Sequence, residues 1–341
     1  MSGFSRSARF LKGLALSRLG RSVPLFVGHT INFKCNLSCA YCGTWRDART
    51  RELPTGKVLE MIDAFSRAGT VSWNLSGGEP LLREDIGEII GFAREKGLAV
   101  SVNTNGILVP EKLESLGRAD LLSVSIDSGE RENDLVRGKG SFRKAVKGIL
   151  AAKKAGIKTS IMAVLSPATL SSGCKGVARA IALSRKLGVQ IAFQPMHGDS
   201  YNRIGGGIGY TQAVFRNPNY QNAISLIESE KRRNPRRIRM SWGYLRKLRS
   251  LKPHNCFAGR NFCIIFPDGR IAPCFVRGPA ASPRASPRAT PRATPRATPE
   301  NFARLARTSS CFCHFNCYSE WNALLSLEPE SILHYASNYF G

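Results

Sequence analysis

The 341-residue chain is short of acidic residues: 24 Asp and Glu stand against 50 Lys and Arg, which leaves a formal net charge of +26. The first 46 residues contain no acidic residue at all. Long apolar runs are also absent, and no segment approaches the ~18 apolar residues of a membrane span, which excludes an integral membrane protein. With 10 cysteines, the chain has too few for a small disulfide scaffold. The positive net charge favours phosphate compounds, nucleic acid or anionic lipid as binding partners.

The apolar content, 43% of residues, supplies a core for one large domain or two smaller ones. Strand-like and helix-like segments alternate from about residue 25 to residue 195. We expect strands at 25–33, 71–75, 99–103, 121–126, 158–165 and 189–194, with helices at 57–68, 84–95, 111–116, 142–155 and 174–187. This alternation predicts an α/β protein with a parallel sheet, as a partial or complete TIM-like barrel, and a site at the carboxyl ends of the strands.

Three segments of biased composition flank or interrupt this pattern. Residues 1–24 are basic, and we expect a helix that packs on the domain, with a membrane-surface or partner contact as the alternative. Residues 231–252 hold ten Lys or Arg together with Trp242 and Tyr244. There we expect a solvated basic helix with buried aromatics, with an RNA contact as the alternative. Residues 281–300 repeat Ala-Ser/Thr-Pro-Arg, and the regular prolines predict an extended, exposed insertion.

Three cysteines follow the first predicted strand with the spacing Cys35-x3-Cys39-x2-Cys42. Three thiolates this close can hold one corner of a cubane iron–sulfur cluster. Zinc normally takes a fourth protein ligand nearby, and His29 lies inside the strand, where it is a poor candidate. Three ligands on four irons leave one iron open, and an open metal position is where chemistry occurs.

This spacing, with the aromatic Tyr41 before the last cysteine, resembles the signature of the radical S-adenosylmethionine (SAM) superfamily, over about residues 25–200. The resemblance implies a [4Fe-4S] cluster on Cys35, Cys39 and Cys42 that reductively cleaves SAM to methionine and a 5′-deoxyadenosyl radical. That radical removes a hydrogen atom from a substrate. The resemblance also implies a cytoplasmic oxidoreductase or maturase and a flavodoxin- or ferredoxin-type electron donor.

Further segments at strand ends carry the same resemblance. Gly77-Gly78-Glu79-Pro80 is similar to the family's GGEP motif, which holds the amino group of SAM. Two glycines permit close approach of backbone, and we expect the Glu79 carboxylate to meet the ammonium. Ordinary turn chemistry is the alternative for the segments after the third and fourth strands, and a helix entry with Ser141 as N-cap is the alternative for the segment of Arg137. The remaining cofactor contacts that the resemblance implies are Tyr41, Asn103, Asn105, Ser125, Asp127 and Arg137.

A second group of cysteines lies near the end of the chain. The segment from Asn261 to Cys274 has the pattern of a β-hairpin with a Pro-Asp-Gly turn. Cys256-x12-Gly269-x4-Cys274 is similar to the start of the SPASM and Twitch auxiliary-cluster domains. That similarity implies an auxiliary [4Fe-4S] cluster on Cys256, Cys274, Cys313 and Cys317, with Cys311 competing for the place of Cys313. A zinc ribbon on the same residues is the alternative. We expect Cys263 and Cys174 to be buried thiols.

The sequence thus predicts a basic segment at 1–24, a radical SAM core at 25–230, a basic connector at 231–252 and an auxiliary-cluster domain at 253–341. The substrate expected from the resemblance is a peptide, a protein or a small biosynthetic molecule. The alternatives are an RNA-modifying radical SAM enzyme and a non-enzymatic, metal-binding protein that associates with nucleic acid. The basic segments provide the expected contact with RNA or an anionic membrane surface.

Overall fold

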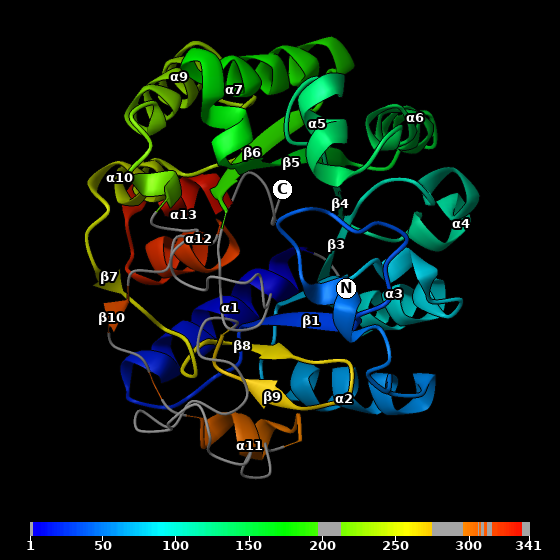
Figure 1. Ribbon diagram of the computed structural model, residues 1–341. Coiled ribbons are helices and arrows are strands. Elements are labelled where there is room, and N and C mark those ends of the chain that lie inside the picture. The colour runs from blue at the N-terminus through cyan, green and yellow to red at the C-terminus, as the bar shows by residue number, and fades with distance from the viewer. Residues whose placement is uncertain are drawn as a thin grey trace, which may run out of the picture.

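The computed structural model describes residues 3–196, 213–274, 296–305, 307, 310–311 and 316–335. Six parallel strands lie side by side in sequence order: β1 (Phe26–Asn32), β2 (Ser72–Gly77), β3 (Ala99–Thr104), β4 (Leu121–Ser125), β5 (Thr159–Leu165) and β6 (Gln190–Pro195). In Figure 1 they form an arc that does not close into a full barrel. The predicted partial (β/α)6 barrel is confirmed.

Helices cover the outer side of this arc (Figure 1). They are α2 (Thr55–Arg67), α3 (Ile86–Glu95), α4 (Leu113–Leu116), α5 (Glu130–Arg137), α6 (Ser141–Lys154) and α7 (Pro167–Leu187), with short 3-10 turns at Thr44–Asp47, Pro80–Leu82 and Val109–Glu111. After β6 come α9 (Tyr220–Arg233) and α10 (Trp242–Ser250). The apolar faces of the strands and helices form one large core.

The two faces of the strands differ in chemistry. On β2, Trp73 points outward and lies edge-on to Phe65 of α2, with ring centroids 6.0 Å apart. The next residue, Asn74, points inward and donates a hydrogen bond to the Ser101 hydroxyl of β3 (2.7 Å). Successive side chains of a strand alternate between its faces, so the outer face is apolar and the inner face carries polar groups.

The C-terminal part of the chain extends this sheet and fills its gap. β8 (Phe262–Ile265) pairs in parallel with β1, and β9 (Ile271–Ala272) pairs antiparallel with β8. The predicted hairpin is therefore present, but it continues the barrel sheet. α12 (Asn316–Leu325) and α13 (Pro329–Tyr335) lie in the opening between β6 and β1 (Figure 1).

Trp321 of α12 anchors this helix inside the opening. Its ring stacks on Phe26 of β1 at 4.7 Å between centroids and lies 5.6 Å from Phe262 of β8. On the side of β6, Glu320 accepts a hydrogen bond from the backbone N–H of Ser241 (2.8 Å). Arg239 precedes that serine and reaches the Ser123 hydroxyl of β4 (3.5 Å). The helix α12 thus closes the open side of the barrel, with Trp321 in contact with β1 and β8 and Glu320 bonded to Ser241 on the side of β6.

Several sequence predictions need correction. The segment before Ser141 contains a helix, α5, that the pattern did not reveal, and Arg137 is its last residue. α7 begins at Pro167, before the predicted start, and has non-helical backbone from Ser171 to Cys174. Most of the repeat at 281–300 lies outside the described residues. Its last unit is not extended, because Thr298 caps the short helix α11 (Pro299–Ala303).

The basic helix α1 (Gly3–Arg18) packs on the domain. Phe10 is buried, Arg9 donates to the Thr70 carbonyl (3.1 Å), and the Ser17 hydroxyl donates to Asn261 (2.8 Å). The helix therefore packs on the domain, as expected from the sequence. No helix in the described part of the chain has the length and apolarity needed to cross a membrane.

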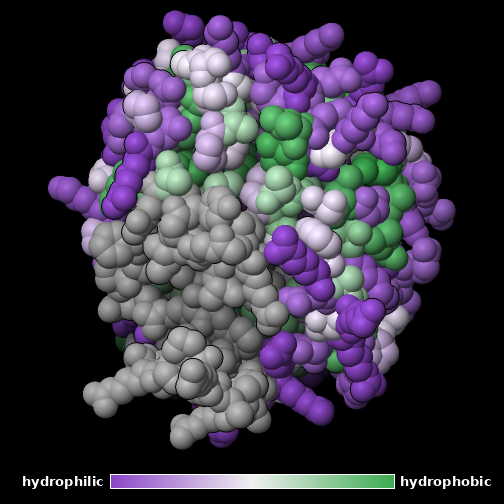
Figure 2. Space-filling model, viewed as in Figure 1, coloured by the Kyte–Doolittle hydropathy of each residue, from purple (hydrophilic) through white to green (hydrophobic). Residues whose placement is uncertain are grey.

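Several basic residues of the segment 231–252 are buried or paired, whereas the sequence predicts a solvated basic helix. Lys231 is buried and donates to the Ile238 carbonyl (3.2 Å). Tyr244 is fully buried and Trp242 is half-buried, as expected for aromatics on an inner side. Arg249 forms an ion pair with Glu228 (2.8 Å). Hydrophilic residues cover much of the described surface in Figure 2.

Candidate active site

The turn after β2 holds the backbone that leads into the first cysteine. Gly78 N–H donates to the Asn32 carbonyl (3.0 Å), and Glu79 N–H donates to the Lys34 carbonyl (2.8 Å). A Cβ added to Gly78 would overlap that Lys34 oxygen, which is backbone and has nowhere to move. Glycine is therefore required here, because the backbone of the turn approaches the Lys34 carbonyl closely. The turn thereby fixes the position of the backbone that leads into Cys35.

The Glu79 side chain connects two strand ends. Its carboxylate is fully buried and accepts hydrogen bonds from the N–H groups of Leu81 (3.1 Å) and Asn105 (2.7 Å) and from the Thr104 hydroxyl (2.7 Å). Burial raises the pKa of Glu79 to about 7, and these hydrogen bonds oppose that rise. We expected this carboxylate to meet the ammonium of SAM. In the structure its hydrogen bonds go to the chain's own groups, and Thr104 is a partner that the sequence did not indicate.

The cysteine loop is tethered on two further sides. Asn36 accepts a hydrogen bond from the side-chain amide of Asn105 (2.6 Å), which follows β3. Ala40 N–H donates to the Val136 carbonyl of α5 (2.8 Å). Cys35, Cys39 and Cys42 are free and partly exposed, in contrast to the buried Cys174, Cys256, Cys263 and Cys274. The three loop thiols are thus held in place and remain open to a ligand.

Three of the predicted cofactor contacts form one buried cluster. Arg137 makes a two-pronged ion pair with Asp127, at 2.8 Å for both bonds. The Tyr41 hydroxyl donates to the same carboxylate (3.0 Å), and the guanidinium lies 5.6 Å from the centre of the Tyr41 ring. Val164 N–H of β5 also donates to Asp127 (2.9 Å). This cluster joins the cysteine loop to β4, β5 and α5.

The inner wall next to this loop is polar and half-buried. Asn103 donates to the side-chain oxygen of Asn74 (3.2 Å), and Ser125 ends β4 on the same inner face. The register places Met162 beside Ser125, and Gln194 beside Val164. Met162 and Gln194 are half-buried, and the sequence analysis did not single them out. The alternation of side chains along a strand could have pointed to them, because both occupy positions that face inward.

The cysteine loop supplies three thiols, and cysteine thiolates are the ligands that hold iron–sulfur clusters. In the described residues, no three His, Cys, Asp or Glu side chains are close enough to hold one ion. Burial, together with the neighbouring Glu79, Cys39 and Cys42, raises the pKa of Cys35 to about 12, and the hydrogen bond from Leu37 N–H opposes that rise. Cluster irons would replace these thiol protons, since the thiolate is the ligand.

His29 is not available as a metal ligand. Burial lowers the pKa of its side chain to about 3, and its ring lies edge-on to Trp73 at 5.7 Å on the outer face of the sheet. Its position in the core therefore agrees with the expectation from the sequence that His29 is a poor metal ligand.

The second group of cysteines lies in an apolar setting. Cys256 and Cys274 are buried in one cluster with Phe262, Phe266 and Ala272. β7 (His254–Asn255) precedes Cys256 and pairs with β10 (Ser310–Cys311), so the later cysteine segment runs beside the earlier one.

The remaining cysteines lie in several different places. Cys313 lies outside the described residues, and Cys317 is placed only as part of α12. Cys263 is fully buried and burial raises its pKa, as expected for a core thiol. Cys174 is also buried, and its thiol donates to the Asn219 carbonyl (3.0 Å).

Comparison with known proteins finds relatives over the barrel part of the chain. Residues 30–171 match the model of the Radical SAM superfamily. Mycofactocin maturase MftC of Mycolicibacterium smegmatis is 33% identical over 151 residues, which are 43% of this chain and 38% of that protein. The AdoMet-dependent heme synthase of Methanosarcina barkeri is 27% identical over 282 residues, covering 74% of this chain and 77% of that protein. The matched region is thus less than two fifths of MftC, but most of the heme synthase.

Solved structures share the fold. Streptococcus suis SuiB bound to its precursor peptide SuiA superposes with a TM-score of 0.62 at 17% identity, over 77% of this chain and 62% of SuiB. The enzyme anSMEcpe with bound AdoMet gives a TM-score of 0.57 at 19% identity, over 74% of this chain and 71% of that one.

The partial barrel and its cysteine loop define an iron–sulfur protein of the α/β barrel class. More specifically, residues 30–171 carry the radical SAM domain that the sequence indicated, and the radical SAM relatives of this chain are enzymes. The cofactors of this family are a [4Fe-4S] cluster and SAM.

Proposed function

We propose that the protein is a radical SAM enzyme whose Cys35, Cys39 and Cys42 hold the SAM-binding [4Fe-4S] cluster. When bound and reduced, this cluster supplies one electron that cleaves SAM to methionine and a 5′-deoxyadenosyl radical, which takes a hydrogen atom from a substrate. The chain supplies position: the Gly78–Glu79 turn, Asn105 and the Asp127–Arg137 pair hold the loop. The observation that supports this proposal most is that three free, half-exposed thiols lie in one loop tethered to the carboxyl ends of the strands.

The predicted cofactor contacts remain part of this proposal. Gly77 and Pro80 flank the turn, and Asn103 and Ser125 line the adjoining inner wall. We propose that SAM lies between this wall and the cysteine loop, because that position is bordered by half-buried polar groups. The Asp127, Arg137 and Tyr41 cluster borders the same place from the side of β4.

An auxiliary [4Fe-4S] cluster on Cys256, Cys274, Cys313 and Cys317 is the second part of the proposal. It is supported by the burial of Cys256 and Cys274 in one cluster and by the pairing of β7 with β10. Cys311 remains the competitor of Cys313. With this cluster, residues 253–341 act as a SPASM- or Twitch-like unit attached to the barrel through β8.

The proposed substrate is a peptide, a protein or a small biosynthetic molecule. MftC is called a maturase and SuiB was solved with a precursor peptide, whereas the heme synthase of M. barkeri matches over most of both chains. We place the protein in the cytoplasm, with a flavodoxin- or ferredoxin-type protein as the electron donor.

Anaerobic reconstitution tests the first cluster. We expect about eight irons per chain, as for two cubanes, and formation of 5′-deoxyadenosine from SAM when dithionite is added. The triple variant Cys35→Ala/Cys39→Ala/Cys42→Ala should retain about four irons and lose SAM cleavage. Cys263→Ala, which removes a buried thiol outside both sets, should keep the full iron content and the activity. Zinc in place of iron, or intact SAM under reductant, would contradict the proposal.

A second pair of variants tests the auxiliary cluster separately. Cys256→Ala/Cys274→Ala should lose about four irons while dithionite-driven SAM cleavage persists, because the cysteine loop after β1 is unchanged. An unchanged iron content would show that these two cysteines do not hold a cluster.

A further inference from the structure

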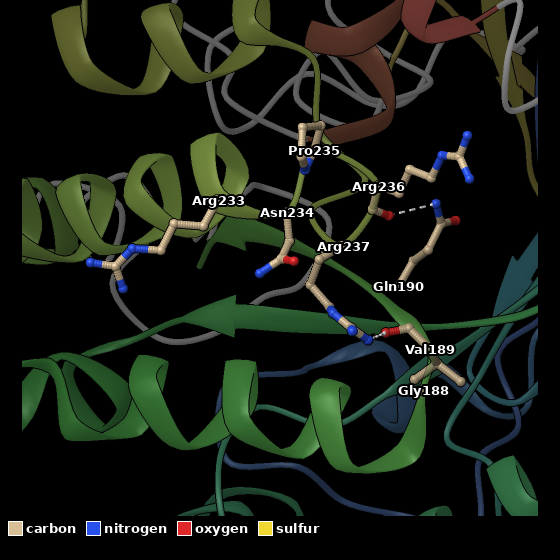
Figure 3. Close-up of a pocket in the computed structure, with 8 residues that line it drawn as sticks. All are labelled: Gly188, Val189, Gln190, Arg233, Asn234, Pro235, Arg236 and Arg237. Atoms are coloured by element: carbon tan, nitrogen blue, oxygen red, sulfur yellow. Dashed lines mark hydrogen bonds between the residues drawn. The ribbon is translucent and has the colours of Figure 1, made fainter.

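A hollow of about 510 Å³ lies at the amino end of β6. Parallel strands place their amino ends together, so this hollow is at the opposite end of the barrel from the cysteine loop. Three of its eight lining residues are arginines and none is aromatic. Figure 3 shows the lining residues, which are Gly188, Val189, Gln190, Arg233, Asn234, Pro235, Arg236 and Arg237.

Basic side chains outnumber acidic ones around this hollow, where Glu230 accepts a hydrogen bond from Asn234 (3.2 Å) and interacts with Arg237. Three helices end nearby, and each carries Lys or Arg in its last turn: α6, α7 and α9. The cations Lys154, Lys186, Arg233 and Arg236 form no ion pair with any residue that the structure describes. Arg185 is matched by Glu230.

The amino-end face near β2 to β4 is different, because there the cations are matched. Asp63 pairs with Lys96 (2.6 Å) and also with Arg67. Asp120 pairs with Arg94 (2.9 Å), next to the first residue of β4. One half of this face is therefore nearly neutral locally, and the other half concentrates positive charge around a hollow.

Arg237 gives the hollow a preformed donor. Its terminal nitrogen donates to the carbonyls of Ser184 (3.0 Å) and Val189 (3.3 Å), which holds the guanidinium in place. Its Nε is buried and has no hydrogen-bond partner among the described residues. The loop itself is held by Gln190, whose amide donates to the Arg236 carbonyl (3.0 Å), as drawn in Figure 3. A buried N–H without a partner favours an acceptor at this position.

We propose that this hollow binds an extended anion that carries several phosphate groups. Guanidinium groups match phosphate oxygens in geometry and charge. Arg233 and Arg236 extend to opposite sides of the loop in Figure 3, so an elongated anion with several phosphate groups offers oxygens to both guanidinium groups. The lack of aromatic lining means that bases are not stacked here and that the phosphates provide the contact. The site is separate from SAM cleavage and does not depend on the proposed function.

Binding of two probes by the reconstituted full chain tests the proposal. The probes are a short inorganic polyphosphate, measured by calorimetry, and a fluorescein-labelled single-stranded oligoribonucleotide, measured by anisotropy at several salt concentrations. Arg233→Glu/Arg236→Glu should weaken binding of at least one probe by about tenfold or more. For the RNA, the salt dependence should also become shallower by about two in slope, one for each arginine.

The matched control is Arg21→Glu/Arg131→Glu, which makes the same change in net charge at two exposed arginines away from the hollow. We expect it to change binding by no more than about twofold. A loss with both probes identifies phosphates of nucleic acid as ligands; a loss with polyphosphate alone identifies a smaller phosphorylated compound. Equal losses in the two double variants, or no binding by the unaltered protein, would overturn the proposal. Arg237→Lys keeps the charge but removes the Nε donor, and it should also weaken binding.

Discussion

The two cysteine segments of this protein are held in contrasting ways. The first lies in a loop that is fastened by hydrogen bonds from the Gly78–Glu79 turn and Asn105, and its thiols are partly exposed. The second begins beside a hairpin that pairs with β1, and Cys256 and Cys274 are buried among aromatic side chains. An open, hydrogen-bonded loop suits a cluster that must meet a second molecule. A closed, apolar setting suits a cluster that is shielded from water.

The difference also determines which substitutions matter. The first segment depends on individual polar atoms with single partners, so an isosteric change is enough to damage it. The second depends on buried apolar volume, so a loss of volume is needed. The following predictions test this division, from the largest expected effect to the smallest.

Asp127→Ala should have the largest effect on the first segment. It leaves the Arg137 guanidinium buried without its carboxylate and should lower the free energy of unfolding by about 3–5 kcal/mol. Glu130→Ala is the control, because it removes the exposed carboxylate that pairs with Arg143 (2.6 Å), and it should cost less than about 1 kcal/mol. Denaturant unfolding measures both. Equal losses would mean that the buried cluster does not fasten the loop.

Trp321→Ala should have a similar but somewhat smaller effect on the second segment. It removes a buried ring that stacks on Phe26 and contacts Phe262, and we expect a loss of about 3–4 kcal/mol in unfolding free energy. Trp321→Phe retains a ring against Phe26 and should lose clearly less. If polar contacts rather than buried apolar volume held this helix, Trp321→Ala and Trp321→Phe would lose the same stability. Thermal unfolding of the two variants distinguishes these outcomes.

Glu79→Gln tests the hydrogen bonds of the turn at constant shape. The new amide N–H₂ must face a donor, either an N–H group or the Thr104 hydroxyl, which should cost about 1–3 kcal/mol and reduce SAM cleavage. Glu84→Gln alters an exposed carboxylate whose one ion-pair partner among the described residues is Lys112, and it is the matched control. Unchanged unfolding and activity in Glu79→Gln would show that the turn does not require the carboxylate.

Glu320 should give the closure of the barrel a pH dependence. Burial raises its pKa to about 7, above the usual value of a glutamate, and this rise is opposed by the hydrogen bond from Ser241 N–H and by the cations of Arg239 and Lys231. The folded protein therefore holds this proton more tightly than the unfolded chain, and its contribution to stability falls as pH rises from about 4.5 to 7. Glu320→Gln should flatten that part of the curve. If the variant and the parent protein lose stability in parallel over this range, Glu320 does not titrate as described.

Much of the fold was predictable because its signals are local. The alternation of apolar strands and amphipathic helices located all six parallel strands, and the hairpin from Phe262 to Ala272 followed from its Pro-Asp-Gly turn. α5 was missed because its eight residues are strongly polar, with only Leu135 and Val136 as apolar residues to mark a buried face. The pairing of β8 with β1 was also missed, since nothing in a strand's sequence names its neighbour.

The candidate site divides in the same way. The spacing of Cys35, Cys39 and Cys42 and the glycines of the turn were readable because they depend on residues close in the chain. The hydrogen bond between Thr104 and Glu79, and the pair formed by Asn36 and Asn105, join segments far apart in sequence. Their polarity was visible in the sequence, but their partners were not.

By itself, the sequence determined the succession of strands and helices, the cysteine spacings and the resemblance to the radical SAM superfamily, because each depends on short-range pattern and composition. Only the tertiary structure decided that Glu79 bonds to strand ends, that α12 closes the open side of the barrel, and that unmatched arginines gather at the amino end of β6. These features arise from contacts between distant segments, and such contacts are specified by packing of the whole chain.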